Sequence, residues 1–165
     1  MSTIQTLISE IKQEAKGTRK TLQNVPFDQL DWKPHEKSMK LKSLAIHIAQ
    51  LAGWAGLIVQ TDELDFAKNE LPNPKVSSLE DLLKYFDEGV QQSVEALNAT
   101  TEDDLKKEWT LRHGANVLMK LPKAAFIRTM AMNHLYHHRA QLGVYLRLLD
   151  IPVPGMYGPS ADDRA

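Results

Sequence analysis

The chain has 165 residues, which is close to the usual size of one domain, and its 42% hydrophobic and 25% charged residues are typical of a globular protein. The chain has 20 Lys and Arg residues and 21 Asp and Glu residues, for a net charge of −1. A protein that binds the phosphate backbone of a nucleic acid normally has an excess of basic residues on one face. No such excess is evident here, so we expect no nucleic-acid partner. The chain has no cysteine, which excludes disulfides, thiolate metal sites and Cys nucleophiles.

The N-terminal residues lack the basic start and the continuous apolar run of a signal peptide. No stretch approaches the roughly 20 apolar residues of a membrane span. We therefore expect one domain over residues 1–165, soluble and cytoplasmic, with no membrane partner.

The first two predicted helices cover residues 3–24 and 39–60. In each, apolar residues recur every three or four positions, which is the spacing of one helix face. Ser2, with Gln5 three residues later, has the form of a capping box, and Ser38 is placed to cap the second helix.

A third apolar stripe predicts a helix over residues 78–98, and Ser77 with Glu80 again has the spacing of a capping box. From residue 100 to 121 the helical pattern weakens. Residues 109–111 favour extended structure and Gly114 favours a turn, but no second strand is evident. We expect a long connection here, with room for one short helix.

The fourth predicted helix covers residues 122–150, and Pro122 suits its first turn. Its roughly 28 residues would span about 42 Å. The tail, residues 151–165, is too rich in proline and glycine to be helical, and we expect its apolar side chains to pack against the helices. Four apolar stripes without a strand pair predict an all-α four-helix bundle, with the long connection before the last helix.

Six histidines are present, and three of them, His134, His137 and His138, lie close together within the fourth predicted helix. His134 and His138 are four residues apart and so share a helix face, where they could bind one ion. His134 and His137, three residues apart, could do the same. The heptad stripe through Ala131, His134, His138 and Gln141 favours the first pair, because it places both rings at core positions.

His47 lies in the middle of the apolar stripe formed by Leu44, Leu51 and Trp54. Burying an imidazole without partners costs about 1–3 kcal/mol, so the ring needs a partner. A metal ion would satisfy it, and so would a hydrogen bond within the core. A histidine pair four residues apart also occurs on exposed helices without any ion, so residue spacing alone leaves both readings open.

Two sequence segments resemble the DinB-like superfamily of small four-helix metalloproteins, which includes bacillithiol S-transferases and mycothiol-dependent isomerases. These segments are Ser43-Leu-Ala-Ile-His47-Ile and His134-x-x-x-His138-Arg-x-Gln-Leu. The resemblance extends along nearly the whole chain, including the closing Gly-Met-Tyr-Gly-Pro-Ser-Ala-Asp-Asp. It implies an up-down-down-up bundle, a homodimer, and a nickel- or zinc-type ion bound by His47, His134 and His138.

Neutral imidazole suits zinc, nickel, copper and iron, and three protein ligands leave a coordination position open for water or substrate. We therefore expect a metal-dependent enzyme of the thiol-dependent transferase or hydrolase type, acting on a small molecule with a low-molecular-weight thiol as a candidate partner. The alternatives are a non-enzymatic metal-binding bundle and an interaction module. No catalytic residue is assigned, although Arg139 is a candidate for binding an anionic co-substrate.

Overall fold

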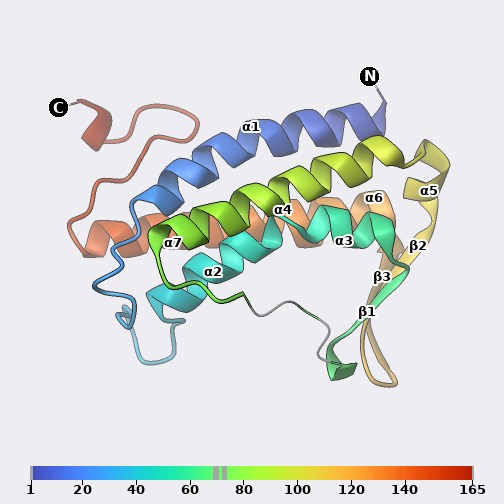
Figure 1. The fold of residues 1–165 in the computed structure, drawn as a ribbon, viewed down its shortest axis with the longest axis horizontal. Helices are drawn as coiled ribbons and strands as arrows, with labels where there is room; N and C mark the ends of the chain where they lie inside the picture. Colours follow the sequence, from blue (N-terminus) through green and yellow to red (C-terminus); the bar gives the residue numbers. More distant parts are fainter. Residues whose placement is uncertain (1, 69–70, 72–73, 165) are drawn as a thin grey trace.

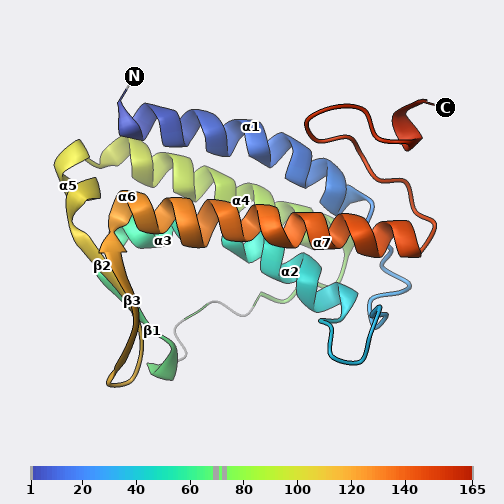
Figure 2. The ribbon, with the colours of Figure 1, turned by 180° about the vertical axis from the view of Figure 1, so that it is seen from behind.

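A computed structural model describes residues 2–68, 71 and 74–164; Met1 and Ala165, the ends of the predicted domain, lie outside this part of the chain. Four long helical segments form the body of the molecule, and a small sheet lies at one end (Figure 1). The long segments are α1 (Thr3–Gln23), α2 (Leu41–Leu51) continued by α3 (Trp54–Gln60), α4 (Leu79–Ala99), and α7 (His134–Leu148). α1 and α7 run in one direction, and α2, α3 and α4 run in the other (Figures 1 and 2).

The sheet corrects the all-α prediction. β1 (Glu63–Asp65) pairs in parallel with β2 (Glu108–His113), which pairs antiparallel with β3 (Asn116–Pro122). The protein is thus mostly helical with a three-stranded sheet, and the expected long connection forms a hairpin after the short helix α5 (Glu102–Lys106). Gly114 lies in the hairpin turn with φ of 58°, as the predicted turn requires.

Trp109 attaches the sheet to the helices. Its ring is fully buried and makes an edge-to-face contact with Phe126, with ring centroids 4.5 Å apart. Its indole nitrogen donates a hydrogen bond to Thr61 Oγ1 at 3.0 Å. The extended structure expected at residues 109–111 is therefore present, and Trp109 stabilises it by burial against the end of the bundle.

The predicted helix over residues 39–60 is two helices, α2 and α3, which are bent by 44° relative to each other. Ser93 of α4 lies fully buried at the break. Its hydroxyl donates to the carbonyl of Ala52 at 2.6 Å and accepts from the N–H of Gly56 at 3.2 Å. A side chain from another helix thus satisfies backbone groups that the interruption would leave unpaired.

The last predicted helix also differs from a regular α-helix. It begins with α6 (Lys123–Phe126), continues as a π-helix (Ile127–Asn133), and becomes α-helical again at His134. π-Helical turns contain an extra residue and are frequent at functional sites. Asp150, with φ of 57°, ends the segment in the left-handed conformation.

The N-terminal caps of the first two helices were predicted with different success. Ser2 caps α1 as expected, since its side chain accepts from the N–H of Gln5 at 3.2 Å. The prediction of Ser38 as a cap is wrong, because α2 begins at Leu41 and its N-cap residue is Lys40.

The capping box of α4 lies one residue later than predicted. Ser78 accepts from the N–H of Asp81, and the Asp81 carboxylate accepts from the N–H of Ser78. Ser77 contributes two more hydrogen bonds to the same carboxylate, from its N–H at 2.9 Å and from its hydroxyl at 2.5 Å. Asp81 thus takes the role that the sequence pattern had given to Glu80.

The C-terminal tail lies against the bundle, as expected, but the prediction that it has no helix is wrong at Asp162–Arg164, which form a 3₁₀ turn. Asn24 donates to the carbonyl of Pro152 at 2.8 Å, and the sulfur of Met156 packs over Gly17, where a Cβ atom would be 2.9 Å away. Tyr157 differs from the expectation of burial, because 79% of the residue is exposed and only its hydroxyl reaches inward.

Among the described residues, no single helix is long and apolar enough to cross a membrane. The bent pair α2 and α3 meets that criterion only when its two helices are taken together. Its apolar side chains are used in the core, where Leu44, Ile48 and Ile58 are fully buried.

We predict that Ser93→Ala lowers the free energy of unfolding by about 1–3 kcal/mol, because it leaves a buried carbonyl and a buried N–H without partners. Urea unfolding of the purified protein measures this change. Ser43→Ala, at an exposed position in α2, is the matched control and should be nearly neutral. Equal stability of the two variants would contradict the role given to Ser93.

Candidate metal centre

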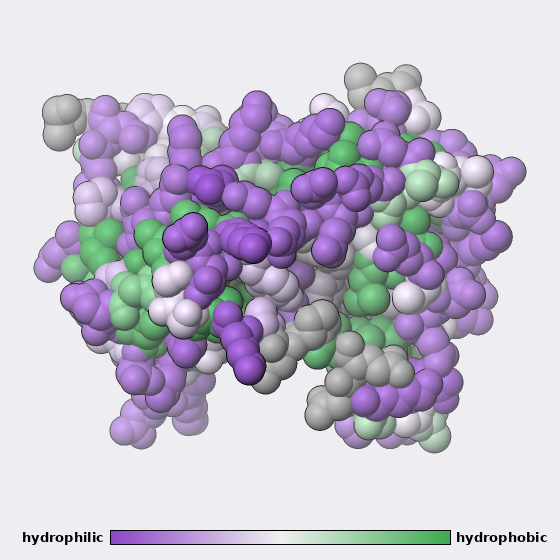
Figure 3. Space-filling model, in the orientation of Figure 1, coloured by the Kyte–Doolittle hydropathy of each residue, from purple (hydrophilic) through white to green (hydrophobic). Residues whose placement is uncertain are grey.

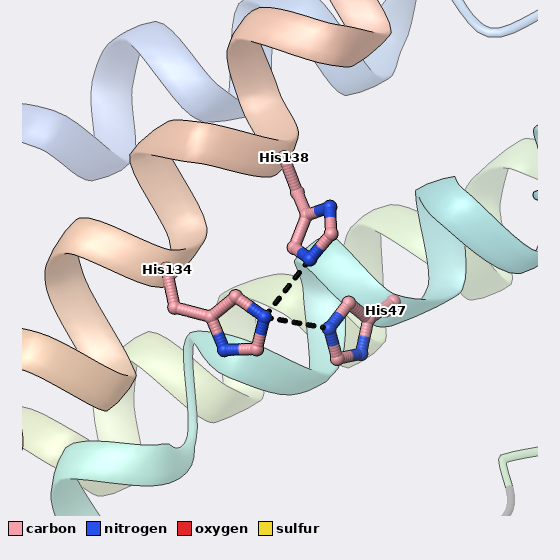
Figure 4. A group of neighbouring side chains, drawn as sticks. All are labelled: His47, His134 and His138. Carbon is pink, nitrogen blue, oxygen red and sulfur yellow. Dashed lines mark hydrogen bonds between the residues drawn. The ribbon is translucent and has the colours of Figure 1, made fainter.

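Helices α2 and α7 bring three histidines together at their contact (Figure 4). His47 projects from the middle of α2, while His134 and His138 project from the first two turns of α7. The Nε2 atom of His134 lies 3.4 Å from that of His47 and 2.9 Å from that of His138. Every pair of ring centroids in this cluster is within 5.0 Å.

These separations suit a shared ion. Bonds of about 2.0–2.1 Å from an ion to two imidazole nitrogens place the nitrogens about 2.9 Å apart at a 90° angle and about 3.3 Å apart at a tetrahedral angle. The 2.9 Å between His134 and His138 equals the first value, and the 3.4 Å between His134 and His47 is close to the second. One ligand atom from each of the three rings lies within 4.8 Å of the other two, so the rings are grouped closely enough to be candidates for a three-histidine centre.

His137 lies outside this cluster. It is exposed, and its Nε2 atom makes a hydrogen bond with the side-chain nitrogen of Gln141 at 3.0 Å. The structure therefore brings His47 together with the pair four residues apart, as the heptad stripe indicated. The alternative pair of His134 with His137 is not the one that faces α2.

Burial favours the neutral form of His47 and of His134. The pKa of His47 is lowered to about 4, chiefly by desolvation and also by the neighbouring His138 and His134, while a hydrogen bond with Gln50 acts in the opposite direction. Desolvation also lowers the pKa of His134, with a further contribution from His138. Neutral imidazole is the form that binds a metal, so the environment favours the ligand state of both rings.

Trp54 forms one wall of the cluster. Its ring lies edge-on to His134, with centroids 6.4 Å apart and planes at 88°. Within the described part of the chain, Trp54 Nε1 and His134 Nδ1 are buried atoms with no hydrogen-bond partner of good geometry. The carbonyl of Met130 still raises the pKa of His134 slightly, against the larger effect of burial.

A cavity of about 600 Å³ lies between α4 and the α2–α3 pair. Gln50 and Trp54 line it, and these two residues also contact His47 and His134. On the face that Figure 3 shows, much of the surface is hydrophilic, with hydrophobic side chains in several separate patches. The cavity thus shares the neighbouring side chains Gln50 and Trp54 with the cluster, and none of the three histidines lines it.

Arg139 does not serve as an exposed anion site. It is buried and pairs with the Glu14 carboxylate at 2.7 Å, and it also donates to the Tyr157 hydroxyl at 2.8 Å. Its guanidinium therefore links α7 to α1 and to the tail. The predicted role in binding an anionic co-substrate is wrong for this arrangement, since the charge is already paired.

Sequence reasoning did not assign a role to Gln141, Gln50 or Trp54 at the site. Gln141 and Trp54 lay on the predicted apolar stripes, which was the available signal for a position near the histidines. Gln141 accepts a hydrogen bond from His138 Nδ1 at 2.8 Å. Leu148, on the same stripe as Gln141, is 58% exposed, so the stripe does not mark buried positions through the last turn of α7.

The fold and the cluster together define a class of helical bundles that build a site from histidines on facing helices. The sequence profile of the DinB family matches residues 1–165. The chain belongs to the DinB family.

Individual relatives agree with this assignment. YrdA, an uncharacterized protein of Bacillus subtilis (strain 168), is 24% identical over 153 residues, which cover 92% of this chain and 86% of YrdA. The solved structure of YjoA, a DinB-like protein of Bacillus subtilis, has a TM-score of 0.70 at 22% identity and covers 89% of this chain and 96% of its own. A DinB-like protein of Bacillus cereus ATCC 10987 has a TM-score of 0.66 at 22% identity, covering 92% and 95%. These two structures share the fold.

We predict that the metal-free protein loses stability as the pH falls from 6.5 toward 4. Over this range the unfolded chain binds a proton at His47 that the folded chain, with its lowered pKa, does not bind. The stability that His47 contributes is complete above pH 6.5 and is lost toward pH 4. Urea unfolding across this range measures the slope, which should be shallower in His47→Gln.

The matched control is His113→Gln, at an exposed position in β2. It should keep the pH dependence of the wild type. A wild-type slope in His47→Gln would show that the ring of His47 is not shielded from protons in the folded state.

Proposed function

We propose that this protein is a metal-dependent enzyme that binds one divalent transition metal, nickel or zinc, through His47, His134 and His138 and acts on a small molecule. The observation that carries the proposal is the convergence of three imidazole Nε2 atoms at separations suited to one ion. The lowered pKa of His47 and of His134 supports it, because protons compete less for the ligand nitrogens.

The chain supplies three ligands and leaves the remaining coordination positions to water or substrate. An ion held in this way can lower the pKa of bound water to about 7, polarise a substrate group, or bind a thiol as its thiolate. The protein holds the three rings on two packed helices, and Trp54 lies edge-on to His134 at one side of the cluster. The cavity lined by Gln50 and Trp54 offers room for a small substrate beside it.

Within this proposal, the reaction is of the thiol-dependent transferase or hydrolase type. The resemblance to the DinB-like superfamily favours a low-molecular-weight thiol as co-substrate. Turnover of an electrophile with and without thiol, measured on the metal-loaded protein, separates the two types. Absence of turnover under both conditions would favour the non-enzymatic metal-binding alternative.

We predict that the purified protein, loaded with zinc or nickel and then desalted, retains one ion per chain. The double variant His134→Ala/His138→Ala should retain almost none, and His47→Ala should lose most of the ion, because each change removes a ligand. Elemental analysis by mass spectrometry measures the content.

His137→Ala is the matched control, because it removes a neighbouring imidazole that lies outside the cluster. It keeps all three ligands and should retain nearly full occupancy after desalting. Equal metal content in the wild type and the double variant would place the site elsewhere and overturn the proposal.

A further inference from the structure

Gln141 connects two neighbouring histidines of α7. Its side-chain oxygen lies 2.8 Å from Nδ1 of His138, and its side-chain nitrogen lies 3.0 Å from Nε2 of His137. Gln141 is three residues after His138 and four after His137, so both rings lie one helical turn away on adjacent faces. One half-buried amide therefore spans a proposed ligand and an exposed imidazole.

The two ends of an amide are chemically different. The oxygen only accepts hydrogen bonds and the NH₂ group only donates them. A ring nitrogen that faces the oxygen must carry a proton, whereas one that faces the NH₂ group must present its lone pair. With its oxygen toward His138, Gln141 selects the tautomer in which Nδ1 is protonated and Nε2 is free.

The Nε2 atom of His138 is the one that faces the cluster, 2.9 Å from His134 Nε2. The tautomer that Gln141 selects is therefore the one that directs a lone pair toward the proposed ion. His137 contacts the other end of the Gln141 amide, its NH₂ group. In the tautomer of His137 that accepts from the NH₂ group, a reversed amide would set the carboxamide oxygen against the Nε2 lone pair.

We propose that Gln141 is a positioning residue that fixes the tautomer and ring orientation of His138, and that His137 sets the orientation of the Gln141 amide. This inference rests on the proposed metal site. It also explains why adjacent histidines have different roles, with His138 as a ligand and His137 as the partner of the residue that orients it.

Outer partners of this kind contribute about 10–100-fold to metal affinity. Gln141→Leu removes the acceptor at similar volume, and zinc affinity should fall by roughly that factor. Gln141→Glu restores an acceptor for Nδ1, so its affinity should equal or exceed that of the wild type. His137→Ala should cause a smaller loss than Gln141→Leu, because the amide can still adopt the productive orientation.

The first measurement is the histidine tautomer in metal-free protein at neutral pH, from long-range ¹H–¹⁵N spectra. The His138 signals are assigned by comparison with His138→Gln. The wild type and Gln141→Glu should show Nδ1–H at His138, and Gln141→Leu should lose this preference. The second measurement is zinc affinity by competition with a chelator for the same proteins.

Gln91→Leu is the matched control, since it removes an exposed glutamine of α4 that also makes a hydrogen bond four residues along its helix. It should leave the tautomer and the affinity unchanged. An Nε2–H tautomer at His138 in the wild type, or equal zinc affinity in Gln141→Leu and the wild type, would overturn the inference. Failure of the wild type to bind zinc or nickel would instead overturn the proposed function, and the tautomer spectra would still decide the role of Gln141.

Discussion

The close approach of three imidazole rings at the contact of α2 and α7 constrains much of this structure. At 2.9 Å, the Nε2 atoms of His134 and His138 either share a hydrogen bond, with one neutral ring donating its only proton, or present two lone pairs that a cation can bind. Burial makes protonation costly, as the lowered pKa of His47 shows. A divalent ion can accept a lone pair from each of the three neutral rings, whereas one shared proton joins only two of them, which is why we interpret the cluster as a metal centre rather than as three hydrogen-bonded core residues.

Two irregular helical segments lie beside this cluster. The bend between α2 and α3 begins after Leu51, one turn beyond His47, and Ser93 satisfies the backbone groups at the break. The π-helix ends immediately before His134, so the ring begins a new α-helical phase. A regular helix through either segment would turn the following residues to different faces, including Trp54 beside His134.

The sequence correctly predicted those features of the structure that a local residue pattern determines. The spacing of His134 and His138 and the position of His47 on an apolar stripe predicted which rings face each other. The break after Leu51 was not predictable in this way, because its stabilising partner Ser93 is 41 residues from Ala52 along the chain. Tertiary contacts of this kind leave no periodic signal in either segment.

The sheet was missed for a related reason. β1 is three residues long, and most side chains of β3 are exposed, including Val117 and Leu118. Neither strand therefore shows the alternation of buried and exposed residues that identifies a half-buried strand. Only Trp109 and Leu111 of β2 carry that signal, and a strand without an evident partner was interpreted as a connection.

X-ray absorption spectroscopy at the edge of the bound metal tests the central claim most directly, because it reports the ligands of the ion itself. The account predicts three imidazole ligands, with metal–nitrogen distances of about 2.0–2.1 Å for zinc and the multiple scattering that identifies imidazole rings. A spectrum without imidazole scattering, or with a first shell made only of oxygen ligands, would contradict the assignment of His47, His134 and His138 as the metal centre.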